Sequence, residues 1–84
     1  MKNLDSIKKK IIYRSEYRGI KEMDILLGSF VKKYINLLSL HELEDLYKIL
    51  EIDDDTIFKW YTKKKDDKRF PPGRVSKLLQ NFKI

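Results

Sequence analysis

The stretch Tyr17-Arg18-Gly19-Ile20-Lys21-Glu22, followed at once by Met23-Asp24-Ile25-Leu26-Leu27, predicts a tight corner between two amphipathic helices. Glycine suits the end of the first helix, because it adopts the left-handed conformation that closes a last turn without steric cost. Glu22 suits the first turn of the next helix, where exposed N–H groups carry partial positive charge. Neither reason requires an arginine, so Arg18 is the residue at which a functional hypothesis begins.

Apolar residues recur every three or four positions on both sides of this corner, and that period is typical of helices. The first predicted helix spans about Asp5 to Tyr17, and the second spans Lys21 to about Asn36. Their predicted inward positions are Leu4, Ile7, Ile11 and Ile12 in the first helix, and Met23, Leu27, Phe30, Tyr34 and Leu37 in the second. Gly28 costs the second helix roughly 1 kcal/mol relative to alanine, so we expect it to permit the close approach of a neighbouring helix.

Capping signals divide the rest of the chain. Ser39-Leu40-His41-Glu42 has the pattern of a capping box, and the helix after it carries Leu43, Leu46, Tyr47 and Leu50. Asp53-Asp54-Asp55 predicts an acidic N-cap for a short helix with Ile57, Phe58, Trp60 and Tyr61. A last helix with Val75, Leu78, Leu79 and Phe82 follows Phe70-Pro71-Pro72-Gly73, since proline stops any earlier helix. No strand-like alternation appears, so the sequence predicts an all-α fold, a compact bundle of about five helices.

The length and composition indicate one small soluble domain. We expect residues 1–84 to form a single helical domain, with a charged linker at about 62–74 before the last helix. The sequence contains no cysteine and no apolar stretch that resembles a signal peptide or a membrane span. These features predict a cytoplasmic protein without membrane insertion.

The net charge of +6 is divided unevenly along the chain. Residues 1–37 hold nine basic and four acidic side chains, residues 38–62 hold two and seven, and residues 63–84 hold eight and two. Opposite charge in consecutive segments suits intramolecular packing as well as it suits an acidic partner. The basic residues are 15 lysines and 4 arginines, whereas phosphate recognition favours the two-pronged guanidinium of arginine.

No group of residues resembles an active site. The single histidine, His41, belongs to the first turn of a helix, where a solvated polar side chain is its ordinary role. Without a second histidine or a cysteine a zinc site is not expected, and the aspartates at 53–55 lack the spacing and the glycine of a calcium loop. No glycine-rich phosphate loop is present, so we expect no enzyme, no metal and no tightly bound cofactor.

Nucleic-acid binding and protein binding are the two remaining classes of function. The lysine runs at 8–10 and 63–65 could contact phosphates, but a solvated charged surface is the simpler explanation. A DNA-binding domain would also carry arginine, asparagine or glutamine at the start of its recognition helix. The last helix contains only Arg74 and Gln80 of these types. A single apolar helix face cannot easily bury Phe58, Trp60 and Tyr61 together. We therefore expect at least two of these side chains to pack in the core and a partly exposed one to lie at a protein–protein interface.

The pattern Arg18-Gly19-x-x-Glu22-x-Asp24, with a leucine pair and Phe30 on the same helix and Phe58-x-Trp60 after an acidic turn, resembles the SdhE-type FAD assembly factors. These are the bacterial counterparts of succinate dehydrogenase assembly factor 2, and some relatives carry the label of CptB-type antitoxin. The resemblance covers nearly the whole chain, residues 5–82. Two positions depart from the pattern: Tyr17 stands where many relatives have a second arginine, and lysines 63–65 stand where relatives often have glycine.

The resemblance implies a five-helix bundle that binds the flavoprotein subunit of succinate dehydrogenase, or of the related fumarate reductase. It also implies that the bundle promotes covalent attachment of FAD to a histidine of that subunit, without holding FAD tightly itself. The family motif maps onto Arg18, Gly19 and Glu22 with Asp24 beside it, and Tyr17, Phe58 and Trp60 complete the predicted partner-binding set. The alternative function is a small basic helical protein that binds nucleic acid or neutralises a toxin.

Overall fold

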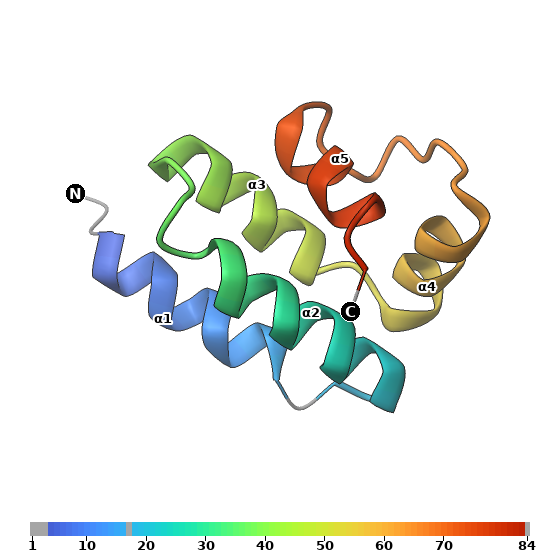
Figure 1. Ribbon diagram of the computed structural model, residues 1–84, viewed down its shortest axis with the longest axis horizontal. Helices are drawn as coiled ribbons and strands as arrows, with labels where there is room; N and C mark the ends of the chain where they lie inside the picture. Colours follow the sequence, from blue (N-terminus) through green and yellow to red (C-terminus); the bar gives the residue numbers. More distant parts are fainter. Residues whose placement is uncertain (1–3, 17, 84) are drawn as a thin grey trace.

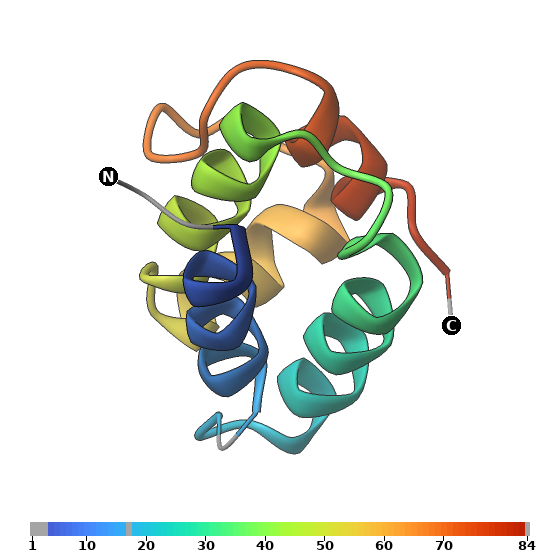
Figure 2. The ribbon, with the colours of Figure 1, turned by 90° about the vertical axis from the view of Figure 1, so that its left-hand side faces the viewer.

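The computed structural model describes residues 4–16 and 18–83, and these residues form five helices and no strand (Figure 1). The helices are α1 (Leu4–Ser15), α2 (Lys21–Tyr34), α3 (Leu40–Leu50), α4 (Asp54–Lys63) and α5 (Arg74–Gln80). α1 packs against both α3 and α2, and α5 packs against α3 and α4. Figure 2 shows α1 next to both α2 and α3. The predicted all-α class is therefore confirmed.

One apolar core takes side chains from all five helices. Met23, Leu27 and Phe30 of α2 are each at most 1% exposed, as the periodicity predicts. The α2 stripe is shorter than predicted, because the helix ends at Tyr34 and Leu37 beyond it is 65% exposed. In α1 only Ile11 of the predicted positions is fully buried, since Leu4 and Ile12 are both more than two-fifths exposed.

The predicted N-caps of α3 and α4 are confirmed. At the start of α3 the Glu42 N–H donates to Ser39 Oγ at 3.2 Å, and the Ser39 N–H donates to Glu42 Oε1 at 2.9 Å. At the start of α4 the Thr56 N–H donates to Asp53 Oδ2 at 3.0 Å. Each contact satisfies a backbone N–H that has no partner within its own helix.

Two predictions about glycine are wrong. Gly19 does not close α1 in a left-handed conformation, because Gly73 and Lys64 are the only described residues with positive φ. α1 ends earlier, at Ser15, where the Ser15 hydroxyl donates to the Ile12 carbonyl at 2.8 Å and the Glu16 N–H donates to the Tyr13 carbonyl at 3.2 Å. Gly28 does not receive a neighbouring helix, since a Cβ added there would meet no other part of the described molecule within 4 Å.

The segment between α4 and α5 is attached to the bundle by two stacked rings. The Trp60 and Phe70 rings lie 4.0 Å apart between centroids and only 8° from parallel, and both residues are 6% exposed. α4 continues to Lys63, so it takes the first two residues of the predicted linker. Lys64 then adopts a left-handed conformation with φ 55°, and Gly73 precedes α5 with φ 135°. In the described part of the chain, no helix is long and apolar enough to span a membrane.

Candidate partner-binding corner

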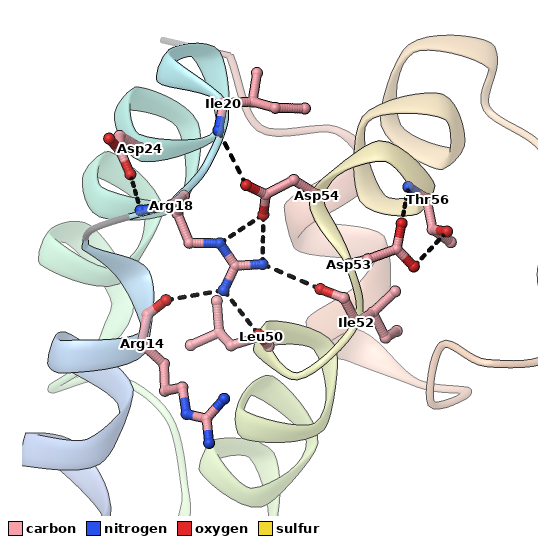
Figure 3. A network of polar contacts seen from close by, with 9 residues as sticks. All are labelled: Arg14, Arg18, Ile20, Asp24, Leu50, Ile52, Asp53, Asp54 and Thr56. Atoms are coloured by element: carbon pink, nitrogen blue, oxygen red, sulfur yellow. Dashed lines mark hydrogen bonds and ion pairs between the residues drawn. The ribbon is translucent and has the colours of Figure 1, made fainter.

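The Arg18 side chain points into the molecule and joins three segments of the chain (Figure 3). Its Nη1 donates to the carbonyl oxygens of Arg14 at 2.9 Å and of Leu50 at 2.7 Å. Its Nη2 donates to the Ile52 carbonyl at 3.0 Å. Nε and Nη2 each lie 2.7 Å from Asp54 Oδ1. The side chain is only 9% exposed, so these contacts are largely shielded from water.

The need for an arginine follows from the helix ends that meet here. The carbonyls of Arg14 and Leu50 belong to the last turns of α1 and α3, where carbonyls have no partner within the helix. Helix C-termini also carry partial negative charge, which a cation stabilises. A guanidinium presents five N–H donors in a fixed plane, so one side chain can serve both helix ends and a carboxylate. Arg18 therefore has a structural role that the sequence argument, based only on the helix end and the acidic first turn, did not include.

Asp54 completes the corner from the first turn of α4. Its Oδ1 accepts from the Arg18 guanidinium, and its Oδ2 accepts from the Ile20 N–H at 3.1 Å. Asp24 of α2 reaches back in the same region, where its Oδ1 accepts from the Arg18 N–H at 2.6 Å. The two carboxylates thus fix the backbone on both sides of Gly19, which is exposed.

Glu22 lies on the outside of this rigid corner. It is exposed at the second position of α2, and it makes no hydrogen bond or ion pair with another described residue. Gly19 is also free of internal constraint, because its φ is not left-handed and an added Cβ would lie at an ordinary 3.7 Å from Asp54 Oδ2. Among the motif residues, Arg18 and Asp24 therefore hold the corner together by internal hydrogen bonds, while Gly19 and Glu22 are exposed on its surface.

The two aromatic candidates on α4 lie in different environments. Phe58 is 38% exposed, and it follows Asp54 by four residues, so the two lie one turn apart on the same face of α4. Trp60 is turned into the core, where it stacks on Phe70. Of these two aromatic residues, Phe58 is thus the exposed one. The remaining candidate, Tyr17, lies outside the described residues.

Sequence reasoning missed Asp54 as a part of the site. The run Asp53-Asp54-Asp55 was explained by helix capping, but only Asp53 caps α4 through its side chain. Asp54 instead binds Arg18, 36 residues away. Two features of the sequence could have indicated such a pairing. The run at 53–55 has three aspartates although one suffices to cap a helix, and the acidic segment at 38–62 lies between two basic segments.

The fold and the corner define a class of protein: a small all-α module built around a largely buried arginine–aspartate pair, beside an exposed glutamate that pairs with no other described residue. Comparison with known proteins identifies the family. The family model described as flavinator of succinate dehydrogenase, Sdh5, matches residues 9–83. The chain therefore belongs to this family, and the resemblance to FAD assembly factors is confirmed.

Several curated relatives carry the name mitochondrial succinate dehydrogenase assembly factor 2. The protein of Lodderomyces elongisporus is 36% identical over 81 residues, which cover 92% of this chain and 49% of the relative. The Debaryomyces hansenii protein is 35% identical over 82 residues, with 93% and 58% covered, and the Dictyostelium discoideum protein is 36% identical over 78, with 93% and 55% covered. The chain thus spans about half the length of these relatives. No solved structure matches the chain.

Proposed function

We propose that this protein binds the flavoprotein subunit of succinate dehydrogenase, or of fumarate reductase, and promotes the covalent attachment of FAD to it. The observation that carries the proposal is the family match over residues 9–83. Glu22, which is exposed on the rigid corner and pairs with no other described residue, would supply a contact suited to that role. The match does not favour the alternative of a nucleic-acid-binding or toxin-neutralising protein.

The flavin and its acceptor histidine would supply the chemistry, and both belong to the partner. This protein would contribute by binding the reaction-competent arrangement of the partner more tightly than other arrangements. Such a binder needs no catalytic residue and no tight FAD site, and the relatives are likewise named assembly factors. We expect it to act in the cytoplasm, although the curated relatives are named mitochondrial.

The role of each motif residue follows from its position. Arg18, Asp24 and Asp54 would keep the corner in one conformation before the partner arrives, which lowers the entropic cost of binding. Glu22 would accept charge-assisted hydrogen bonds from a cation or from backbone N–H groups of the flavoprotein. Gly19, without a side chain, would let the partner backbone approach the corner. Phe58 would add an aromatic contact at the edge.

The proposal is tested in cells that lack the gene for this protein. Covalent FAD remains fluorescent on the flavoprotein subunit after denaturing electrophoresis, whereas non-covalent FAD is lost. We expect fluorescence of this subunit to fall without the protein and to return when the wild-type chain is supplied. The same fluorescence with and without the protein, at equal amounts of the subunit, would contradict the proposal.

A further inference from the structure

A groove lined by positive charge lies between the end of α2 and α5, and we name it the α2–α5 groove. Its volume of about 560 Å³ is in the range of ligand pockets. Figure 2 shows the segment after α5 beside the end of α2, where the Tyr34 and Phe82 rings lie 6.2 Å apart between centroids. None of the described residues that line the groove is acidic, and four are cations: Lys33, Arg74, Lys77 and Lys83.

Three of these four cations have no carboxylate of the described chain beside them. Arg74 pairs with Glu42 of α3, with 3.4 Å between Nε and Oε2. Lys33, Lys77 and Lys83 are exposed, and none of them forms an ion pair with another described residue. Like charges gathered in one groove produce a positive potential that attracts an anion. The α2–α5 groove therefore favours a negatively charged occupant.

The floor of the groove is apolar. Tyr34, Leu78 and Phe82 line it, and all three are half-buried side chains that pack against the core. A small anion such as phosphate would contact the lysines and leave this apolar surface uncovered. A peptide carries carboxylates and an aliphatic side chain within a few residues, so it can contact both the cations and the floor.

The rings of the floor are poorly placed to stack on a nucleobase. The Lys33 ammonium lies over both rings, 5.7 Å from the Tyr34 centroid and 5.9 Å from the Phe82 centroid. Single-stranded nucleic acid is bound by cations together with open aromatic faces on which bases stack. Phosphate recognition also favours arginine, and Arg74 is already paired with Glu42. These contacts favour a peptide carboxylate over a nucleic-acid phosphate.

We propose that the α2–α5 groove binds an acidic peptide segment of a partner protein, with carboxylates on Lys33, Lys77 and Lys83 and an aliphatic side chain on Leu78. Ammonium groups and carboxylates form charge-assisted hydrogen bonds, which are stronger than neutral ones. The groove lies at the end of α2, whereas the corner lies before its start. The peptide site is therefore separate from the proposed flavoprotein contact at Glu22.

The test measures binding of a dye-labelled peptide of glutamates with one central leucine to the full chain, by fluorescence anisotropy in about 0.1 M salt. We expect Lys33→Gln combined with Lys77→Gln to weaken binding about tenfold, because two charge contacts are lost. The matched control is Lys9→Gln combined with Lys10→Gln on α1, which changes the net charge equally. The control should bind within about twofold of wild type, since salt screens distant charges. All four lysines are exposed, so both variants should keep the wild-type circular dichroism spectrum.

The peptide with glutamine in place of glutamate should not bind, and the peptide with glycine in place of leucine should bind more weakly than the original. No binding of the original peptide, or equal weakening by the two double variants, would overturn the proposal. Tighter binding of single-stranded oligothymidine, or equally tight binding of pyrophosphate, would assign the groove to phosphates instead. A wild-type dimer that dissociates on the Lys33 and Lys77 changes would assign it to a second copy of this chain, and would likewise overturn the proposal.

Discussion

Arg18 ties the ends of α1 and α3 to the start of α4 through a single side chain. Both members of its ion pair are largely buried, with side chains 9% and 13% exposed. Removing the guanidinium would leave a carboxylate and three carbonyl oxygens without this donor. A buried group left unpaired loses the hydrogen bonds that water once gave it, and that loss is the main cost of breaking such a pair.

We predict that Arg18→Ala lowers the free energy of unfolding by about 3–5 kcal/mol, the range for breaking a buried ion pair. That is a large part of the roughly 5–15 kcal/mol available to a small domain. Urea unfolding followed by circular dichroism measures the change. The control is Arg69→Ala, since Arg69 is 61% exposed in its pair with Asp67 and an exposed ion pair contributes little to stability. Equal losses for the two variants would contradict the structural role of Arg18.

We predict that Asp54→Asn is also destabilising, by about 1.5–3 kcal/mol, because it removes a charge-assisted partner of Arg18 while keeping the size of the side chain. Asp55→Asn is the matched control within the same acidic run. Asp55 is 68% exposed and pairs with the exposed Lys59 four residues on, so its change should stay within about 0.5 kcal/mol. A larger loss for Asp55→Asn than for Asp54→Asn would refute this assignment.

At the scale of the helices, local capping chemistry is the part of the fold that sequence predicts best. Ser39 and Glu42 are three residues apart, so their reciprocal hydrogen bonds are set by the backbone of one turn. The reason for Gly28 was mistaken, because sequence shows that a side chain is missing but not what lies opposite it. The end of α1 was misplaced for a similar reason, since Ser15 closes the helix with its own hydroxyl.

We predict that Ser39→Ala costs about 1 kcal/mol, the usual value for losing a helix N-cap. Ser39→Asp is the control, because a carboxylate can accept the same N–H bond and also suits the positive end of α3. The measurement is the urea midpoint of each variant relative to wild type. If Ser39→Asp is destabilised as much as Ser39→Ala, the capping box does not contribute to stability.

At the scale of the whole molecule, the pairing of distant segments could not be read from sequence. Charge showed that the acidic segment at 38–62 could pack against the basic segments. It did not show that Asp54, among seven acids, would bind Arg18. The choice depends on the packing of α1 against α3, which brings the carbonyls of Leu50 and Ile52 to the same guanidinium. Only the assembled core sets these positions.

We predict that the protein loses stability as the pH falls below about 4. The Arg69 side chain lowers the pKa of Asp67 to about 2 from 3.8. The Ser39 N–H lowers the pKa of Glu42, and the Thr56 hydroxyl lowers that of Asp53. The unfolded chain therefore binds more protons than the folded one in this range, so stability is present above the unfolded pKa values and is lost as the pH falls through the folded ones.

The measurement is the urea midpoint of the wild-type protein and of Asp67→Asn between about pH 5 and pH 2.5. The wild-type midpoint should fall over this range, and the variant should fall less because it lacks one of the shifted groups. Parallel curves for the two proteins would show that Asp67 does not contribute to the acid dependence. A wild-type midpoint that rises on acidification would contradict the sign of the prediction.

The central claim, that this helical module promotes covalent FAD attachment through the corner, is tested most directly with purified components. The flavoprotein subunit without covalent FAD is mixed with FAD and with wild-type chain, Glu22→Gln or Asp66→Asn, and covalent fluorescence is followed over time. Asp66 is an exposed linker residue and serves as the control. We predict that wild type and Asp66→Asn accelerate attachment and that folded Glu22→Gln does not. Equal acceleration by Glu22→Gln, or none by wild type, would contradict the claim.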